Sequence, residues 1–591
     1  MSETKNRTHI TLLATSDLHG HLFPYNYMES RETNAGSLAQ IATAVKKLYD
    51  PGHTILADCG DTIQDNFADL FLEDEIHPMM EGLNDIGYDI WTTGNHEYDF
   101  GMDTLKRIIR QFKGHAVLGN VFDENGNRIA EPYVILEKAG VRIAVLSMVT
   151  PNIREWNETL LEGYTVTNPI DETRKLLEEL EGRYDVLIGI HHMGFMDEFG
   201  VEGSGVLSYL NYCPEFDVVM ASHEHLFREA RIVNGVLAAE NLGSARSMFK
   251  ITLDLERSGE KWKVIDRRAE SFLMNAFEPD TAFLEKYRGA HERALKNTRR
   301  VIGSVKGDMP LGGVNPIESF AVSEFEPKPL MTLLNRVLQY YSGAQVSCAA
   351  MSKYRTNLDP GKVTVSDAAW LFPYPNIVNK LKMTGRQLRK YMEFNAQYYQ
   401  TYRKGDLTIT INPEWEIYMH MFFSGVNYVI DISKEPGHRI TTLTWPDGIP
   451  VKDEDEFLFA VASFSYTTYL NDYGPVFSEE DGLPELIEEG VRPDLGYIPY
   501  MIIDYIEHVL HGNVEPENEN NWKIVGHSWD EALHRKALKY LMKGWIPESM
   551  ISRPENHDVW PIRLEHILEA EMTNREEEGD GTEDSLSGKH K

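Results

Sequence analysis

The sequence predicts a layered α/β protein with two folded domains, and three observations support this prediction. The chain has 591 residues, 42% of them hydrophobic and 25% charged, which is too long for one hydrophobic core and typical of a folded globular protein. Short apolar segments alternate with segments of helical periodicity in both halves. In the first half, five of the apolar segments each end in a cluster of polar residues.

The five apolar segments are predicted strands, because each is short and rich in β-branched residues. They are residues 10–14, 54–57, 90–93, 186–190 and 218–221. Segments 37–49 and 102–112 have helical periodicity and lie between strands. In layered α/β folds, ligands collect where the carboxyl ends of the strands open onto loops. The five polar clusters are therefore expected to converge at one place.

A charged amphipathic segment at 278–300 is predicted to be a linker helix between the two domains. It follows a first domain at 1–277 and precedes a second α/β domain at 301–545. The second domain has predicted helices at 329–341 and 384–399 and a strand at 457–462. Residues 546–591 form a C-terminal extension, expected to be disordered from about residue 573, where apolar residues nearly disappear.

The composition excludes several classes of partner. With 58 Lys and Arg against 92 Asp and Glu, the net charge of −34 repels nucleic acid polymers and anionic membrane surfaces. The three cysteines, Cys59, Cys213 and Cys348, form no pair typical of a disulfide framework or a thiolate zinc site. Without an apolar run of about 18 residues or a signal-like start, we expect a cytoplasmic protein. It would be exported if a leader has been removed, and the oligomeric state stays open.

The polar clusters contain carboxylate, imidazole and amide groups that suit divalent zinc, manganese, iron or cobalt. The candidate ligands are Asp17, His19, Asp61, Asn95, His192, His223 and His225. Seven ligands are too many for one ion, but they suit two ions about 3.5–4 Å apart that share a carboxylate, as in phosphoryl hydrolysis. Alternatively, any one of these histidines could be an ordinary hydrogen-bonded residue. The indication of a metal site comes from all five clusters together.

The polar clusters contain five motifs, Asp17-Leu18-His19, Gly60-Asp61, Gly94-Asn95-His96-Glu97, His192-Met193-Gly194 and Ser222-His223-Glu224-His225. In this order they resemble the motifs of the calcineurin-like metallophosphoesterases. The resemblance implies a four-layer β-sandwich flanked by helices. It also implies one cation at Asp17, His19, Asp61 and His225, and a second at Asp61, Asn95, His192 and His223. His191 is expected to pack in the core or to support a ligand.

His96 and Asp99 are the predicted catalytic residues. His96 follows Asn95, so its imidazole can face a phosphate oxygen, and Asp99 three residues later can fix its tautomer. The resemblance implies that this pair polarises the phosphate or protonates the leaving oxygen. The alternative for Asp99 is to cap the helix predicted at 102–112.

The resemblance extends to about residue 545, where the chain is similar to the bacterial 5′-nucleotidase family with its C-terminal nucleotide-binding domain. Segments 370–377, 383–399 and 150–156 are most like the branch of 2′,3′-cyclic-nucleotide 2′-phosphodiesterases with 3′-nucleotidase activity. By this resemblance Tyr374 and Tyr466 stack on the base, Asn376 binds its edge and Arg355 lies near the substrate. The two tyrosines could also be ordinary rim or core aromatics.

The sequence departs from the 5′-nucleotidase pattern at two places. The glycine-rich run expected before Arg355 is absent, and Tyr466 is not followed by two glycines. The predicted function is a two-metal hydrolase of nucleotide phosphoesters, a 2′,3′-cyclic-nucleotide 2′-phosphodiesterase/3′-nucleotidase. The alternatives are a 5′-nucleotidase or UDP-sugar hydrolase and, outside the enzymes, a nucleotide-binding sensor that has lost catalysis.

Overall fold

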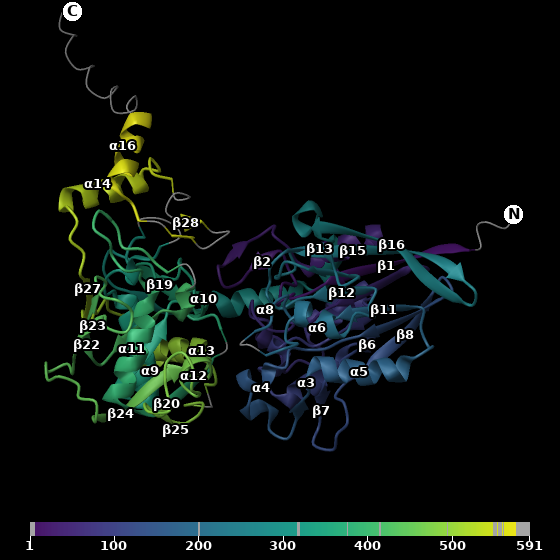
Figure 1. Cartoon of the computed structure of the whole chain (residues 1–591), viewed down its shortest axis with the longest axis horizontal. Helices are drawn as coiled ribbons and strands as arrows, with labels where there is room; N and C mark the ends of the chain where they lie inside the picture. Colours follow the sequence, from purple (N-terminus) through teal and green to yellow (C-terminus); the bar gives the residue numbers. More distant parts are fainter. Residues whose placement is uncertain are drawn as a thin grey trace, which may run out of the picture. The chain divides into compact units, whose positions relative to one another are not determined.

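The computed structural model describes residues 6–198, 201–315, 320–374, 376–412, 415–492, 495–547, 552–553, 558–559 and 561–574. The chain separates into two compact units, residues 1–299 and 300–591. Both are mixtures of helices and sheets, which confirms the predicted α/β class (Figure 1).

Two six-stranded sheets form the centre of the first unit. In the first sheet the strand order is β16 (Lys261–Leu273), β15 (Ser247–Ser258), β1 (Arg7–Thr15), β4 (Thr54–Asp58), β5 (Ile90–Trp91) and β6 (His115–Ala116). In the second it is β13 (Arg228–Val233), β14 (Val236–Glu240), β12 (Val218–Ala221), β11 (Val186–Ile190), β9 (Val141–Leu146) and β8 (Tyr133–Lys138). Strands β1, β4 and β5 run parallel, as do β9, β11, β12 and β14. The polar clusters therefore follow parallel strands at one edge of each sheet.

The two sheets pack face to face through a buried apolar core. Leu12 and Ile55 of the first sheet share this core with Ile188 and Met220 of the second. On the outer face of the second sheet, α5 (Pro169–Leu180) and α6 (Val206–Tyr212) pack against the strands. Helices α1 (Leu38–Leu48) and α2 (Pro78–Ile86) pack together in the first unit and carry further buried apolar residues. The sandwich of sheets flanked by helices agrees with the prediction.

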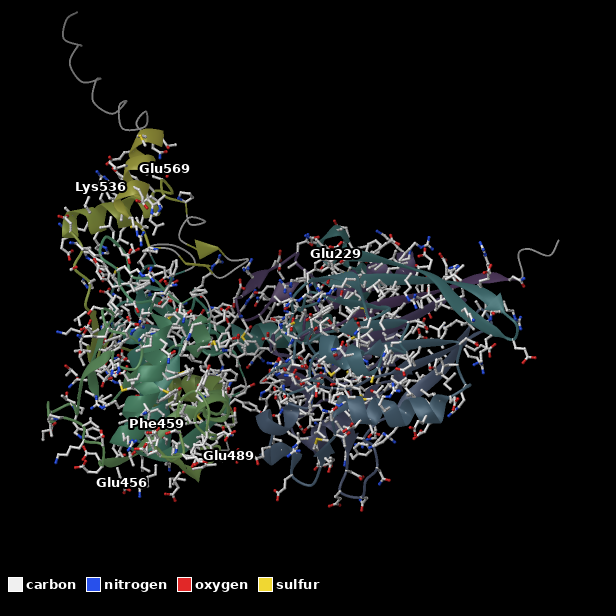
Figure 2. All side chains as sticks on the ribbon, viewed as in Figure 1. Glu229, Glu456, Phe459, Glu489, Lys536 and Glu569 are labelled. Carbon is white, nitrogen blue, oxygen red and sulfur yellow. The ribbon has the colours of Figure 1, made fainter. Side chains whose placement is uncertain are left out.

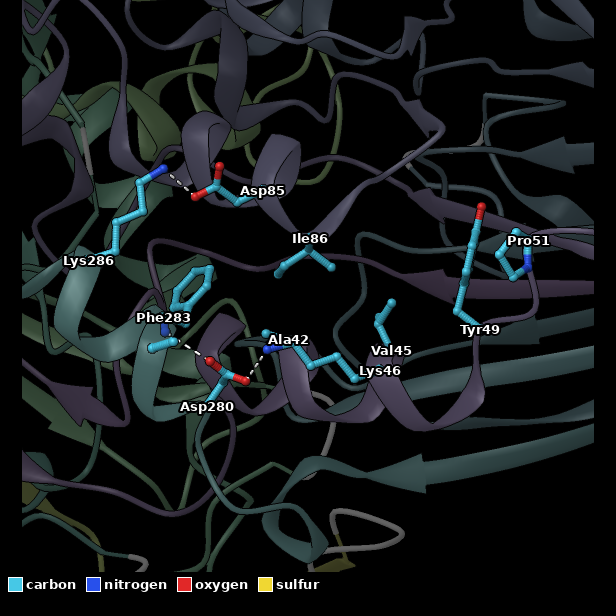
Figure 3. Close-up of a pocket in the computed structure, with 11 residues that line it drawn as sticks. Ala42, Val45, Lys46, Tyr49, Pro51, Asp85, Ile86, Asp280, Phe283 and Lys286 are labelled. Carbon is cyan, nitrogen blue, oxygen red and sulfur yellow. Dashed lines mark hydrogen bonds and ion pairs between the residues drawn. The ribbon is translucent and has the colours of Figure 1, made fainter.

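The predicted linker segment folds as two helices of the first unit. α7 (Thr281–Lys286) and α8 (Arg288–Thr298) meet at Tyr287, which is buried and donates a hydrogen bond to Asp85. A groove of about 520 Å³ lies between α1, α2 and α7 (Figure 3). Across it, Lys46 pairs with Asp280 and Lys286 pairs with Asp85. These contacts attach the segment to the first unit.

A five-stranded sheet forms the centre of the second unit. Its strand order is β21 (Met421–Ser424), β18 (Val346–Ala350), β24 (Glu456–Ala462), β20 (Val378–Thr384) and β25 (Glu485–Glu488). Strand β24 begins at exposed Glu456 and continues into the core at Phe459 (Figure 2). β18 runs parallel to β24, and β20 runs antiparallel to it. The ends of β18 and β24 and the start of β20 therefore lie at the same edge.

Helices and two small sheets complete the second unit. The helices are α9 (Pro329–Ser342), α10 (Val365–Trp370), α11 (Gly385–Asn395), α12 (Ser463–Tyr469) and α13 (Ile498–Asp504). The three-stranded sheets are β19 (Gly361–Thr364), β17 (Val301–Val305) and β26 (Asn513–Val514), and β23 (Ile440–Thr444), β22 (Asn427–Asp431) and β27 (Trp522–Val525). Helix α9 packs against β18 and β24, and α11 packs against β20. The helix predicted at 384–399 becomes a 3₁₀ turn after Asn395.

Two further helices, drawn in yellow in Figure 1, are α14 (Glu531–Met542), at the end of the predicted second domain, and α16 (Leu564–Thr573), in the predicted C-terminal extension. They bury Tyr540 and Ile567 in a small apolar cluster with Leu407. Lys536, labelled in Figure 2, pairs with Glu571. The tail expected to be disordered lies outside the described residues beyond residue 574. Across the described ranges, no helix combines the length and apolar character needed to cross a membrane.

The core of the second unit contains a buried carboxyl group, Glu324. It accepts hydrogen bonds from the amide of Ala321, at 2.6 Å, and from the hydroxyl of Tyr398. The ring of His420 stacks on Tyr398, with 4.1 Å between centroids. Burial raises the pKa of Glu324 from 4.5 to about 8, although the hydrogen bonds from Tyr398 and Ala321 lower it.

We predict that Glu324→Gln changes the pH dependence of stability. A carboxyl with a raised pKa in the folded state stabilises that state at low pH, and this stability is lost as the pH rises from about 4.5 to about 8. Gln cannot ionise, so the variant should gain about 1.4 kcal/mol in free energy of unfolding relative to wild type per pH unit between these values. Urea denaturation at several pH values measures this difference.

Glu326→Gln is the matched control, because Glu326 is exposed and lies only two residues away. The difference in free energy of unfolding between this control and wild type should not change over the same pH range. If the difference for Glu324→Gln is also independent of pH, the prediction is wrong.

Candidate active site

Five loops at the carboxyl ends of parallel strands bring the predicted ligands together. Asp17 and His19 follow β1, Asp61 follows β4, and Asn95 follows β5 from the first sheet. The second sheet adds three histidines, one after β11 and two after β12; they are His192, His223 and His225. Two sets of side chains result, each with its carboxylate and imidazole ligand atoms within 4.8 Å of one another.

The first set consists of Asp17, His19, Asp61 and His225. The Nε2 atoms of His19 and His225 lie 2.9 Å apart. Asp61 Oδ2 lies 3.7 Å from His19 Nε2, and Asp17 Oδ1 lies 3.5 Å from His225 Nε2. Asp17, His19 and Asp61 are buried, whereas the His225 side chain is partly exposed.

The second set consists of Asp61, His192 and His223, with the amide of Asn95 between the histidines. Asn95 Oδ1 lies 3.0 Å from His192 Nε2 and 2.8 Å from His223 Nδ1. Asp61 Oδ2 lies 3.2 Å from His192 Nε2. Asp61 is thus common to both sets, and its role as the bridge between two cations stays a prediction.

The hydrogen bonds of the imidazoles leave lone pairs directed into this centre. His192 Nδ1 donates to the carbonyl oxygen of Cys59, at 2.7 Å, and His19 Nδ1 donates to Gln64 Oε1, at 3.0 Å. Neutral rings then present bare Nε2 atoms to Asp61, which offers only acceptors. Acceptors this close repel one another unless extra protons or cations lie between them.

Two carboxylate oxygens at this centre also lack hydrogen-bond donors. Asp17 Oδ2 and Asp61 Oδ2 are buried, and neither has a hydrogen-bond partner among the described residues. Buried carboxylate oxygens normally accept hydrogen bonds or bind metal. Spacings near 3 Å between ligand atoms also suit neighbouring ligands of one ion, whose metal–ligand bonds are about 2.0–2.2 Å. The donor set therefore fits divalent cations.

His96 lies beside this centre and is paired with Asp99. Its Nδ1 is 2.7 Å from Asp99 Oδ2, and its ring makes an edge contact with the ring of His19. The helix α3 (Met102–Gln111) begins after Gly101 and receives no side-chain cap. The alternative that Asp99 caps this helix is therefore wrong.

Burial and neighbouring charges shift the pKa values of His96 and His192 in opposite directions. Burial lowers the pKa of His96, but the carboxylates of Asp99 and Asp61 raise it to about 9. Burial likewise lowers the pKa of His192, and Asp61 raises it to about 10. Cations at the centre would neutralise part of this negative charge and lower both values.

Comparison with known families agrees with this geometry. Residues 10–227 match the calcineurin-like phosphoesterase family, and residues 301–476 match the 5′-nucleotidase C-terminal domain. The chain is a calcineurin-like phosphoesterase with a 5′-nucleotidase C-terminal domain. It is therefore a metal-dependent hydrolase of nucleotide phosphoesters.

Relatives of this phosphoesterase share low sequence identity over most of the chain. The trifunctional nucleotide phosphoesterase protein YfkN of Bacillus subtilis is 24% identical over 88% of this chain, which spans only 39% of YfkN. A 2′,3′-cyclic-nucleotide 2′-phosphodiesterase/3′-nucleotidase of Haemophilus influenzae is 25% identical over 89% of both chains. The crystal structure of a Staphylococcus aureus protein with alpha-ketoglutarate matches with a TM-score of 0.71, at 16% identity, over 88% of this chain and all of that one. At this identity, it supports the fold alone.

The phosphoesterase also relies on Glu97, whose role the sequence did not reveal. Glu97 is fully buried, and its carboxylate accepts hydrogen bonds from the amides of Asp61 at 2.9 Å, Thr62 at 2.6 Å and Gly94 at 2.6 Å. It thus joins the loop after β4 to the loop after β5. In the sequence, the position of Glu97 in the Gly94–Glu97 motif is the one indication that this residue belongs to the site.

His191 lies outside both sets of the phosphoesterase. Its Nδ1 accepts a hydrogen bond from the amide of Met148, at 3.1 Å, and its ring packs edge-on against Tyr209 and Phe216. Burial lowers the pKa of His191 to about 3, so the ring stays neutral. It packs in the core, which is one of the two roles expected for it.

The four predicted substrate residues lie in the second unit, on three loops at one edge of the five-stranded sheet. Arg355 follows β18, Tyr374 and Asn376 precede β20, and Tyr466 lies on α12 after β24. Tyr374 and Arg355 are exposed, and Tyr466 is half-buried. Asn376 Oδ1 accepts hydrogen bonds from the amide of Phe464 at 2.8 Å and the hydroxyl of Ser463 at 3.1 Å. Its oxygen therefore anchors the start of α12, which ties the Tyr374 loop to the helix of Tyr466.

We predict that Gly94→Ala weakens cation binding without unfolding the phosphoesterase. A Cβ at Gly94 would overlap Asp61 Oδ1 and His192 Cε1, so both side chains must move. Affinity for Mn²⁺ should fall at least about tenfold, as for other disturbances of metal ligands. The EPR signal of free Mn²⁺ during titration measures the binding.

Gly289→Ala provides the control, since this glycine lies in α8 and a Cβ there meets no atom within 4 Å. It should bind Mn²⁺ like wild type. Unchanged affinity in Gly94→Ala would contradict the placement of Asp61 and His192 at the cation site.

Proposed function

We propose that this phosphoesterase is a 2′,3′-cyclic-nucleotide 2′-phosphodiesterase with 3′-nucleotidase activity. The observation that carries the proposal is the pair of ligand sets that share Asp61, next to the His96–Asp99 pair. The similarity to the Haemophilus influenzae protein of that name, over 89% of both chains, supports the choice of substrate.

The proposal assigns one divalent cation to each set. Asp17, His19, Asp61 and His225 would hold the first, and Asp61, Asn95, His192 and His223 would hold the second. Zinc, manganese, iron and cobalt all suit these ligands. When bound, the cations supply Lewis acidity at the phosphate and an activated water as nucleophile.

His96 supplies the proton for the leaving group. Its Nδ1 donates to Asp99, so the ring is oriented and Nε2 carries the transferable proton. Hydrolysis of the cyclic ester adds water, breaks the bond between phosphorus and O2′, and leaves the proton on O2′. Hydrolysis of the resulting 3′-nucleotide then breaks the bond between phosphorus and O3′ and releases the nucleoside.

The second unit supplies the site for the nucleoside in this proposal. Tyr374 and Tyr466 would stack on the base, with roughly 1–3 kcal/mol for each stacked face. Arg355 would balance the charge of an anionic substrate in a chain with a net charge of −34. The amide nitrogen of Asn376 is the group left to meet a base edge, since its oxygen is bound to α12.

A 5′-nucleotidase or UDP-sugar hydrolase is the second candidate. The match of residues 301–476 to the 5′-nucleotidase C-terminal domain favours it. The same ligand sets would serve either reaction, so the difference must lie in how the nucleotide is positioned.

We predict that His96→Ala and Asp61→Ala lose activity for different reasons. His96→Ala should keep both cations and lose about 10²–10⁴-fold in kcat, the usual contribution of a general acid. Asp61→Ala should lose cations together with activity, because Asp61 belongs to both sets. Metal analysis and kinetics on the same preparations test both statements. Equal metal loss in the two variants would refute the role of His96.

We also predict the substrate preference. With Mn²⁺, 2′,3′-cyclic AMP and 3′-AMP should be hydrolysed with kcat/KM at least about tenfold above 5′-AMP and UDP-glucose, a difference of about 1.4 kcal/mol. Chromatography of nucleotides and nucleosides measures all four reactions. A preference for 5′-AMP or UDP-glucose would support the second candidate. Binding without any hydrolysis would indicate a nucleotide sensor.

A further inference from the structure

A partly buried carboxylate, that of Glu198, lies behind one of the second-set histidines. The Nε2 atom of His223 lies 2.9 Å from Glu198 Oε1, on the side of the ring away from Asn95. A carboxylate can only accept here, so the ring hydrogen is on Nε2 and the lone pair is on Nδ1. Nδ1 is the atom that faces Asn95 Oδ1, at 2.8 Å.

Glu198 is itself held in place from a different segment. Asn152 Nδ2 donates to Glu198 Oε2, at 3.2 Å, and the amide of Glu198 donates to the hydroxyl of Ser204, at 2.8 Å. Asn152 is buried at the start of the short helix α4 (Ile153–Trp156). Both carboxylate oxygens of Glu198 therefore have partners.

The same helix also contacts the imidazole directly. Trp156 stacks on His223, with 5.5 Å between ring centroids and 24° between planes. Asn152 and Trp156 both belong to segment 150–156. This segment resembles the cyclic-nucleotide phosphodiesterase branch, but the sequence assigned it no role in catalysis or binding. The structure gives this segment a position against the ring of His223.

We propose that Glu198 is a positioning residue that orients the imidazole of His223 toward the second cation. Asn152 and Trp156 keep Glu198 and His223 in place. A carboxylate behind a ligating imidazole fixes its tautomer and orientation and raises its basicity. The inference rests on the proposed function, because it assumes that His223 binds a cation through Nδ1. It adds residues that none of the five family motifs contains.

The test compares Glu198→Gln with wild type by Mn²⁺ titration, monitored by the EPR signal of free Mn²⁺. One of the two binding steps should lose about 10–100-fold in affinity, and the other step should stay unchanged. Glu198→Ala should lose more than Glu198→Gln, since Gln keeps a neutral acceptor. Raising the Mn²⁺ concentration should restore turnover in Glu198→Gln, because the substitution leaves His96 and Asp99 in place.

Glu202→Gln is the matched control, because Glu202 lies four residues away, is exposed and accepts a hydrogen bond from the hydroxyl of Tyr212 instead of from a histidine. It should bind Mn²⁺ like wild type. Thermal unfolding of the metal-free proteins shows whether the fold survives each change. If Glu198→Gln does not fold, Asn152→Ala replaces it and should weaken the same binding step by a smaller factor.

The outcomes separate the two proposals. Wild type that binds fewer than two Mn²⁺ ions would overturn the assignment of cations in the proposed function, and this inference with it. Wild type with two ions, together with unchanged affinities in the Glu198 or Asn152 variants, would overturn this inference alone. A selective loss at one binding step supports it.

Discussion

The concentration of buried acceptor atoms around Asp61 is the constraint on which the active site depends. Asp61 is fully buried, and its carboxylate lies within 3.7 Å of imidazole nitrogens from two different sheets. In a medium of low polarity such acceptors destabilise the fold unless protons or cations join them. The apolar core between the two sheets holds the strand ends at fixed positions and so offsets this cost. Cation affinity is thus created by the packing of the sandwich, and bound cations should stabilise it in return.

The backbone of the ligand loops shows how this concentration is achieved. Five of the seven candidate ligands have positive φ angles: Asp17, His19, Asp61, His223 and His225. Such conformations cost on the order of 1 kcal/mol each for residues other than glycine. They let the chain turn sharply after β1, β4 and β12. Glu97 stabilises the turn at Asp61 by accepting hydrogen bonds from the amides of Asp61 and Thr62, and it also accepts one from the amide of Gly94 in the loop after β5.

The sequence predicted the features that are local or repeated. Strand ends, helices at 37–49 and 102–112 and the order of the five motifs follow from short-range patterns, and they sufficed to group the ligands around Asp61. Contacts between distant loops could not be predicted in this way. Glu198 lies 25 residues from His223 and 46 from Asn152, and nothing in their spacing indicates that they meet. Likewise, helical periodicity predicted the segment at 278–300 but not its break at Tyr287, whose hydroxyl donates a hydrogen bond to the distant residue Asp85.

In the proposed function, substrate selection arises in the second unit, where the chain departs from the 5′-nucleotidase pattern. The ligand sets would treat all phosphoesters alike, because they would meet only the phosphate and its leaving oxygen. The loops of the second unit differ, since side chains replace the expected glycines before Arg355 and after Tyr466. Asn376 accepts a hydrogen bond from the amide of Phe464, which ties the loop of Tyr374 to the start of α12, the helix of Tyr466. If the two tyrosines stack on the base as proposed, the backbone contact that joins their segments contributes to specificity together with the side chains.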